Sequence, residues 1–202
     1  LASLVAGSNN TAVGFYALEN NTGSNNTALG YQSLLVNAGG ASNVAIGRDC
    51  MANNSTGGEN VAIGTFALEN NAIGAQNVVV GASAGNLVAG SRNVILGYSA
   101  AATMGAINDI VAVGYQALLG NTIGTGNTAI GTSALLTNTA GGNNTAVGLS
   151  SLAGNTLGSN NTSLGLTSGT GVVAGNANTM IGQAAGSTVD VSNTVVVGQN
   201  AQ

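Results

Sequence analysis

The chain has 202 residues, a net charge of −4 from two arginines and six acidic residues, and no histidine, proline or tryptophan. Charged residues make up 4% of it, against about 25% in an average domain, so no basic surface for nucleic acid exists. Hydrophobic residues make up 44%, which excludes a disordered polar tract, and no apolar run approaches the roughly 20 residues of a membrane helix. We therefore expect neither nucleic-acid binding nor membrane insertion by this segment.

The first ordered segment that the sequence predicts, NNTAVGFYALENNTGSNNTALG at 9–30, states one phrase twice: NNTA, an aliphatic residue and a glycine. The glycine that closes the phrase recurs every 16 or 17 residues to the end of the chain. No change of composition divides the copies, so we expect one repeat domain over 1–202, a fragment of a longer fibre-like protein. The repeat glycines are Gly14, Gly30, Gly47, Gly64, Gly81, Gly97, Gly114, Gly131, Gly148, Gly165, Gly182 and Gly198.

Each repeat glycine follows a short segment that alternates in a strand-like way. The residue before the glycine is aliphatic in every copy, the residue three before it is Thr or Val, and a mostly small residue separates them. This alternation predicts a strand. Three residues after the glycine only Ala, Ser or Cys occurs, often followed by Leu or Met, which predicts a second short strand close to another backbone. The rest of each copy has the composition of turns.

A repeat of this length cannot bury its own apolar residues, whereas stacked copies can. We therefore predict an all-β parallel β-solenoid of about twelve coils, each of 16–17 residues. One such rod is thin and has a small core. We expect another chain to pack against its row of small residues, three positions after the repeat glycine. We expect an oligomer, with three-fold symmetry favoured.

Asparagine stands four residues before the repeat glycine in ten of the twelve copies. Stacked amides can hydrogen-bond from coil to coil, and Asn also suits the turn before a strand, so both interpretations stay open. Copies seven and twelve carry Ile110 and Thr194 instead, and we expect a local irregularity in 103–114. The inner Asn row, as we call it, consists of Asn10, Asn26, Asn43, Asn60, Asn77, Asn93, Asn127, Asn144, Asn161 and Asn178.

The phrases NTAVGFYA, NVAIGTFA, NTAIGTSA and NTAVGLSS, with GYQSL at 30–34 and GYQAL at 114–118, resemble known repeats. They are similar to the YadA-like head repeats of trimeric autotransporter adhesins and of related phage and bacterial tail-fibre proteins. The resemblance implies a left-handed β-roll, a homotrimer, and an extracellular place on a virion tail fibre or a bacterial cell surface. It also implies contact with a host-cell receptor or glycan. The coils here are a few residues longer than YadA-type coils.

Catalytic chemistry has few candidate residues. The chain has no histidine or lysine, and Glu19 and Glu69 share a repeat position but stand three coils apart, roughly 14 Å. That separation is too large for a carboxylate pair, so we expect no enzyme, no cofactor and no metal site. The acids are interpreted as solubilising charges, and Cys50, where other copies have Ala or Ser, as a packed small residue.

The six aromatic residues all lie one or two positions after a repeat glycine, where the sequence varies most. Such positions face solvent in a solenoid and could contact a sugar or protein receptor. The alternative, which we favour, is that the rings fill space at the edge of a subunit contact. Phe15 belongs to this group, and the candidate receptor-contact residues are Tyr16, Tyr31, Phe66, Tyr98 and Tyr115.

We therefore expect a structural and adhesive segment of a trimeric fibre that supports host attachment. The alternative is the head domain of a bacterial trimeric autotransporter adhesin. An ice-binding solenoid ranks third, because five successive valines interrupt the threonine row and the alternation is expected to place that row inward.

Overall fold

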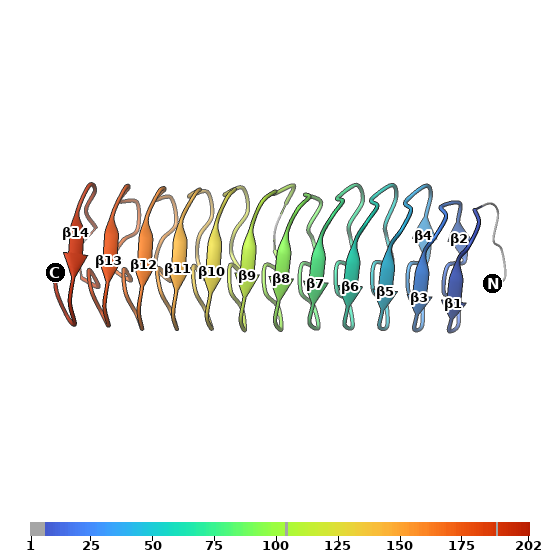
Figure 1. Ribbon diagram of the computed structural model, residues 1–202, viewed down its shortest axis with the longest axis horizontal. Helices are drawn as coiled ribbons and strands as arrows, with labels where there is room; N and C mark the ends of the chain where they lie inside the picture. Colours follow the sequence, from blue (N-terminus) through green and yellow to red (C-terminus); the bar gives the residue numbers. More distant parts are fainter. Residues whose placement is uncertain (1–6, 104, 189) are drawn as a thin grey trace.

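The computed structural model describes residues 7–103, 105–188 and 190–202. Within these ranges the chain forms strands, turns and bends and no helix, and it winds about one axis so that its coils stack side by side (Figure 1). It passes twelve times through one parallel sheet, which makes about eleven turns and confirms an all-β parallel β-solenoid. The strands of this sheet are β1 (Thr11–Val13), β3 (Thr27–Leu29), β5 (Val44–Ile46), β6 (Val61–Ile63), β7 (Val78–Val80), β8 (Val94–Leu96), β9 (Val111–Val113), β10 (Thr128–Ile130), β11 (Thr145–Val147), β12 (Thr162–Leu164), β13 (Thr179–Ile181) and β14 (Val195–Val197).

The strands pair in chain order and in one register. Thr128 of β10, for example, lies opposite Val111 of β9 on one side and Thr145 of β11 on the other. Because every copy pairs at the same repeat position, residues that are equivalent in sequence form rows parallel to the axis. We number the coils by their repeat glycines, so that coil 1 contains Gly14 and coil 12 contains Gly198.

The pleat of this sheet decides which rows lie inside. The middle residue of each strand from Ala28 onward is buried, whereas the residues on both sides of it are half-buried or exposed. The Thr or Val three residues before the glycine therefore points outward with the aliphatic residue, and the expectation that the threonine row lies inward is wrong.

The predicted second strand directly after the glycine is also wrong. The segment is a turn in which alternate residues adopt the left-handed conformation, as Gln116 and Leu118 do with φ of 55° at each. This conformation curls the chain so that Leu118 points into the core. The short second sheet consists of β2 (Asn20–Asn21) and β4 (Val36–Asn37), each of which begins six residues after a repeat glycine.

The row of small residues three positions after the glycine does not meet another chain. Its members in coils 1 to 11, from Ala17 to Ala185, are buried inside the coil. Their size is set by the narrow interior, where the inner strand residue and the turn face each other. The expectation that this row offers a surface for a second chain is therefore wrong, and any such surface must lie elsewhere.

The core is filled in two ways. In coils 1–4 and 7–9 a Leu or Met four residues after the glycine packs above an Ala of the strand. Coils 5, 6, 10 and 11 have Gly or Ala at that position. Coils 5, 6 and 11 carry a larger inner strand residue, Val79, Ile95 or Met180, whereas in coil 10 the side chain of Met180 from the next coil approaches Gly169. A Cβ added at Gly85 would lie 3.2 Å from Cδ1 of Ile95. The exchange conserves core volume and recurs after five coils.

The irregularity expected in 103–114 does not reach the sheet. Strand β9 pairs in full register with β8 and with β10, and Ile110 is buried at the position of the missing asparagine. Met104 lies outside the described residues. The departure is thus confined to side chains, in the row described below.

The repeat glycines offer a test of coil stacking. Gly114 has φ of +135°, and a Cβ there would lie 2.5 Å from the carbonyl oxygen of Gly131 in the next coil. We expect Gly114→Ala to lower the free energy of unfolding by about 3 kcal/mol, measured by urea denaturation.

The matched control is Gly39→Ala, because the nearest atom to its added Cβ would be Cγ2 of Thr56 at 3.9 Å. We expect its effect to stay within about 0.5 kcal/mol. Equal losses for the two variants would contradict the close backbone approach between coils.

Candidate functional site

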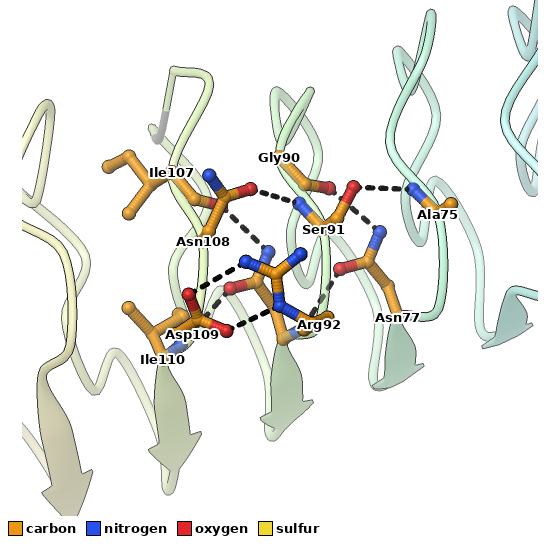
Figure 2. Close-up of polar contacts among 10 residues, drawn as sticks. Ala75, Asn77, Gly90, Ser91, Arg92, Ile107, Asn108, Asp109 and Ile110 are labelled. Atoms are coloured by element: carbon orange, nitrogen blue, oxygen red, sulfur yellow. Dashed lines mark hydrogen bonds and ion pairs between the residues drawn. The ribbon is translucent and has the colours of Figure 1, made fainter.

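The inner Asn row bridges the coils through both ends of each amide. Oδ1 of Asn77 accepts a hydrogen bond from the backbone N–H of Asn93 at 3.0 Å, and its Nδ2 donates to the carbonyl of Gly90 at 2.9 Å (Figure 2). Both partners belong to the next coil. The amide thus satisfies a turn carbonyl and a strand-entry N–H that would otherwise be buried without partners, so the ladder and the turn interpretation describe the same bonds.

Ile110 ends one run of this row. Its backbone N–H donates to Oδ1 of Asn93 at 3.1 Å, as Figure 2 shows, but its side chain has no oxygen to offer to the next coil. The row resumes at Asn127, whose Nδ2 donates to the carbonyl of Gly141 at 2.8 Å. The second run of the inner Asn row ends in the same way at Thr194, whose backbone N–H donates to Oδ1 of Asn178 at 3.1 Å.

A second ladder of buried asparagines was missed by the sequence analysis. Nδ2 of Asn138 donates to Oδ1 of Asn121 at 2.7 Å and to the carbonyl of Gly141 at 2.9 Å, and the pattern repeats in neighbouring coils. The signal was present, since Asn recurs seven residues after the repeat glycine, but these residues were assigned to the turns. The second Asn row consists of Asn21, Asn37, Asn54, Asn71, Asn121, Asn138 and Asn155.

The second Asn row stops where the core changes its filling. Within the described residues, Oδ1 of Asn71 and Oδ1 of Asn155 have no hydrogen-bond partner. The next coils carry Val88 and Val172 at this position, which pack where the turn has Gly in place of Leu. An apolar residue needed for packing therefore displaces the donor that would extend the ladder.

The outward sheet face is an apolar feature that runs the length of the rod. It consists of the aliphatic row and the Thr/Val row, two side chains per strand over all twelve strands, and Val13 and Leu164 on it are 57% and 47% exposed. The aliphatic row comprises Val13, Leu29, Ile46, Ile63, Val80, Leu96, Val113, Ile130, Val147, Leu164, Ile181 and Val197.

Three of the eight charged residues, Glu59, Arg92 and Asp109, lie at an outer corner, five residues before the repeat glycine. There the guanidinium of Arg92 donates to both carboxylate oxygens of Asp109, at 2.6 and 2.8 Å (Figure 2). The hydrogen bond from Arg92 holds the pKa of Asp109 below its usual value. Glu59 accepts a bond from Nε2 of Gln76 at 3.0 Å on the same corner. Both contacts join successive coils in solvent, where such pairs contribute little to stability.

Asp190 caps a turn. Its Oδ1 accepts hydrogen bonds from the backbone N–H groups of Val173, Ala174 and Gly175, at 2.9, 3.0 and 2.7 Å. These bonds, led by the one from Val173, hold the pKa of the Asp190 carboxyl below its usual value. The side chain thus supplies an acceptor for three donors of the preceding coil.

The ionisable side chains of the described ranges are scattered along the rod. No group of three or more His, Cys, Asp or Glu residues there is placed to hold a metal ion. Cys50 is buried, its Sγ lies 3.2 Å from the carbonyl oxygen of Ala62, and burial raises the pKa of its thiol to about 12. A thiol with this pKa is protonated at neutral pH and a poor nucleophile.

The aromatic candidates are grouped by the stacking of the coils. Phe15 stacks on Tyr31 with ring centroids 6.0 Å apart, and Tyr98 stacks on Tyr115 at 5.7 Å, each with an interplanar angle of 10°. Tyr16 adjoins Phe15 at 3.8 Å in a tilted arrangement. These rings are exposed, so they are available to a partner.

Phe66, the remaining aromatic candidate, lies apart from the stacked pairs. Its ring lies beneath the guanidinium of Arg48, 4.5 Å from the centroid, and is half-buried.

Comparisons with protein-family models, with curated proteins and with solved structures found no match to this chain. In the part of the chain that the structure describes, no helix is long and apolar enough to cross a membrane.

The second Asn row can be tested at Asn138. Replacing it by Leu leaves Oδ1 of Asn121 and the carbonyl of Gly141 without this donor and removes an acceptor from Asn155. We expect Asn138→Leu to cost about 3 kcal/mol of unfolding free energy, because buried polar groups lose their partners.

The control is Asn53→Ala, which removes an exposed coil-to-coil bond to Asn70. We expect a change within about 0.5 kcal/mol in the same urea titration. A penalty for Asn138→Leu no larger than that of the control would show that the ladder does not stabilise the fold.

The Asp190 cap predicts a dependence on pH. Because its folded-state pKa is lowered, its contribution is fully present above the unfolded-state pKa of about 3.9 and is lost as pH falls through the folded-state pKa. We expect Asp190→Asn to destabilise the protein at pH 7 and to have a smaller effect at about pH 2.5.

Thermal unfolding at both pH values measures this difference, with Glu59→Gln as the control because Glu59 accepts a bond only from the side chain of Gln76. A penalty for Asp190→Asn that is the same at both pH values would rule out a role for the carboxylate charge.

Proposed function

We propose that this chain is a structural and adhesive segment of a trimeric surface or viral tail fibre, which projects and supports the attachment of a receptor-binding appendage to a host cell. The observation that carries the proposal is the outward sheet face. A rod whose polar groups bond along its own axis, and whose one flat face is aliphatic in every coil, is suited to side-by-side assembly with parallel copies of itself.

The size of this face argues for a partner. Eleven coil spacings of about 4.8 Å give a strip about 50 Å long, and two outward residues span about 7 Å of it. The projected area is therefore on the order of 400 Å², made almost wholly of Val, Leu, Ile and Thr. An apolar patch of this size is often functional, and its continuity over all coils favours contact with a partner as long as the rod.

The partner proposed here is two further copies of the chain. A fibre that projects from a surface has distinct ends, so its chains run parallel and are related by rotation about the long axis. The outward face is the same in each copy and would meet its equivalents at that axis. The resemblance to YadA-like repeats supports three copies and a left-handed coil, and we propose with it an extracellular location on a virion or a bacterial surface.

The alternative within the same architecture is the head of a bacterial trimeric autotransporter adhesin. Flanking sequence separates the two: a C-terminal membrane β-barrel indicates the adhesin, and tail-assembly genes beside the coding region indicate the fibre. In both cases the segment acts by holding a binding surface away from its anchor. No catalysis is proposed.

One observation favours ice binding: the threonines of coils 8–11 point outward from the sheet. The neighbouring row is aliphatic throughout, however, and coils 3–7 carry Val in place of Thr. We rank this function below fibre assembly, and the absence of thermal hysteresis in solution would remove it.

Assembly through the outward face is testable by substitution at Ile63, which is 37% exposed on that face. We expect the unmodified chain to have three times the molar mass of one chain in sedimentation equilibrium. Ile63→Lys should shift this mass towards that of a monomer while the far-ultraviolet circular dichroism stays unchanged, because the lysine charge would be buried between chains.

The control is Ile123→Lys, since Ile123 is 70% exposed but lies on a turn outside this face. It should leave the molar mass unchanged. A monodisperse monomer for the unmodified chain would contradict assembly through the aliphatic row.

A further inference from the structure

The residue directly after each repeat glycine forms a third exposed row, which continues the outward side of the sheet past the end of the strand. It contains two stacked aromatic pairs, Phe15 with Tyr31 and Tyr98 with Tyr115. Tyr98 and Tyr115 are 56% and 49% exposed although their rings stack on each other. The second pair therefore presents two hydroxyl groups and much of its ring surface to solvent, whereas in the first pair only Tyr31 carries a hydroxyl and Tyr16 adjoins Phe15.

The pairs recur with the five-coil period of the core. Coils 1 and 2 carry the first pair and coils 6 and 7 the second, so the pairs are about 24 Å apart along the axis. At coils 11 and 12 the same positions carry Gln183 and Gln199, and Nε2 of Gln199 donates to Oε1 of Gln183 at 3.3 Å. Flat side-chain groups, most of them able to form hydrogen bonds, thus recur every five coils along the rod.

The composition of this third row differs from that expected for a row that packs against a parallel copy of the chain. In a straight stack of parallel chains each coil meets the same surroundings, and the aliphatic row accordingly holds only Val, Leu and Ile. The third row instead holds Phe, Tyr, Arg, Thr, Ala, Leu and Gln. Its residues are therefore free to serve a ligand, and their variety favours this role over space filling at the edge of a subunit contact.

The surroundings of the second pair select the chemistry of that ligand. Its neighbours in the row are Ala82 and Thr132, whose short side chains leave the outer ring faces uncovered. Ser99 and Gln116 follow the tyrosines and carry hydrogen-bonding groups without charge. Arg92 and Asp109 lie before the strand rather than after it and pair with each other.

We infer that the two aromatic pairs bind a linear glycan that runs along the rod and is neutral where it crosses the second pair. The apolar C–H face of a pyranose stacks on a tyrosine ring, and its hydroxyl groups bond to the tyrosine hydroxyls and to the neighbouring amide and hydroxyl side chains. This inference rests on the proposed attachment role and names its partner. Because two pairs lie on one axis, a polymer that spans both binds more tightly than a short fragment does.

Intrinsic fluorescence reports on this site directly. The chain has four tyrosines and no tryptophan, and all four tyrosines lie one or two residues after a repeat glycine of coils 1, 2, 6 and 7. The experiment titrates the unmodified chain with maltohexaose, cellohexaose and mannohexaose, and with the parent polysaccharide of each. We expect a saturable change with at least one sugar, and an affinity at least about tenfold higher for its polymer.

The variant Tyr98→Ala/Tyr115→Ala should weaken binding to that polymer about tenfold, measured by isothermal titration calorimetry, with the molar mass of the assembly unchanged. The control variant Leu149→Ala/Leu166→Ala removes exposed side chains at the same repeat position in coils 9 and 10, and it should bind like the unmodified chain.

Three outcomes would overturn the inference: no saturable change with any of these sugars at millimolar concentration, equal affinity of the tyrosine variant and the unmodified chain, or loss of assembly in the tyrosine variant. A trimer that binds none of the sugars removes the glycan site and leaves the fibre proposal standing. A monomer that binds through the tyrosines does the reverse.

Discussion

The structure depends on one constraint: the buried polar groups of each coil must form hydrogen bonds with a neighbouring coil. A solenoid this narrow has little interior volume, so each buried N–H and C=O needs a hydrogen-bond partner, which the next coil supplies. Strand-to-strand bonds serve three residues per coil, and the inner Asn row serves the entry to the strand and a turn carbonyl. The close backbone approach at the repeat glycines follows from the same short spacing.

The same constraint explains how the core varies. A coil has room for one large inward side chain near the turn or on the strand, but not for both. Leu118 is paired with Ala112, whereas Gly85 is accompanied by Val79 and Ile95. Where the volume moves to the strand, Val88 replaces the asparagine of the second row, and Oδ1 of Asn71 is left without a partner. Packing and polar satisfaction compete at these coils, and packing prevails.

Much of the fold could be predicted from the sequence because the period of the glycines and the β-branched positions is set by strand pairing. The strands lie where the alternation predicts them, each ending just before its repeat glycine. The facing of the rows could not be predicted, since period-2 alternation gives two sides without saying which is inside. The turn after the glycine was mistaken for a strand because its left-handed residues, such as Leu118, are not glycine and carry no local signal for positive φ.

The candidate surfaces follow from which rows of side chains point into the core and which point to solvent. Once the small residues and both Asn rows are inside, the aliphatic row and the exposed rings are what remains for partners. The aromatic positions were visible in the sequence, but their stacking into two pairs depends on coil register, which only the three-dimensional arrangement supplies. The second Asn row was equally visible and was overlooked because asparagine is common in turns.

Hydrogen exchange of the asparagine side chains tests the coil-to-coil ladders most directly. In two-dimensional nuclear magnetic resonance spectra recorded after transfer to deuterated water, side-chain amide protons of buried members such as Asn60 and Asn138 should persist for hours. Those of exposed residues such as Asn9 and Asn53 should vanish within the dead time. Loss of both sets at the same rate would contradict the account, because the ladders would then not hold the coils together.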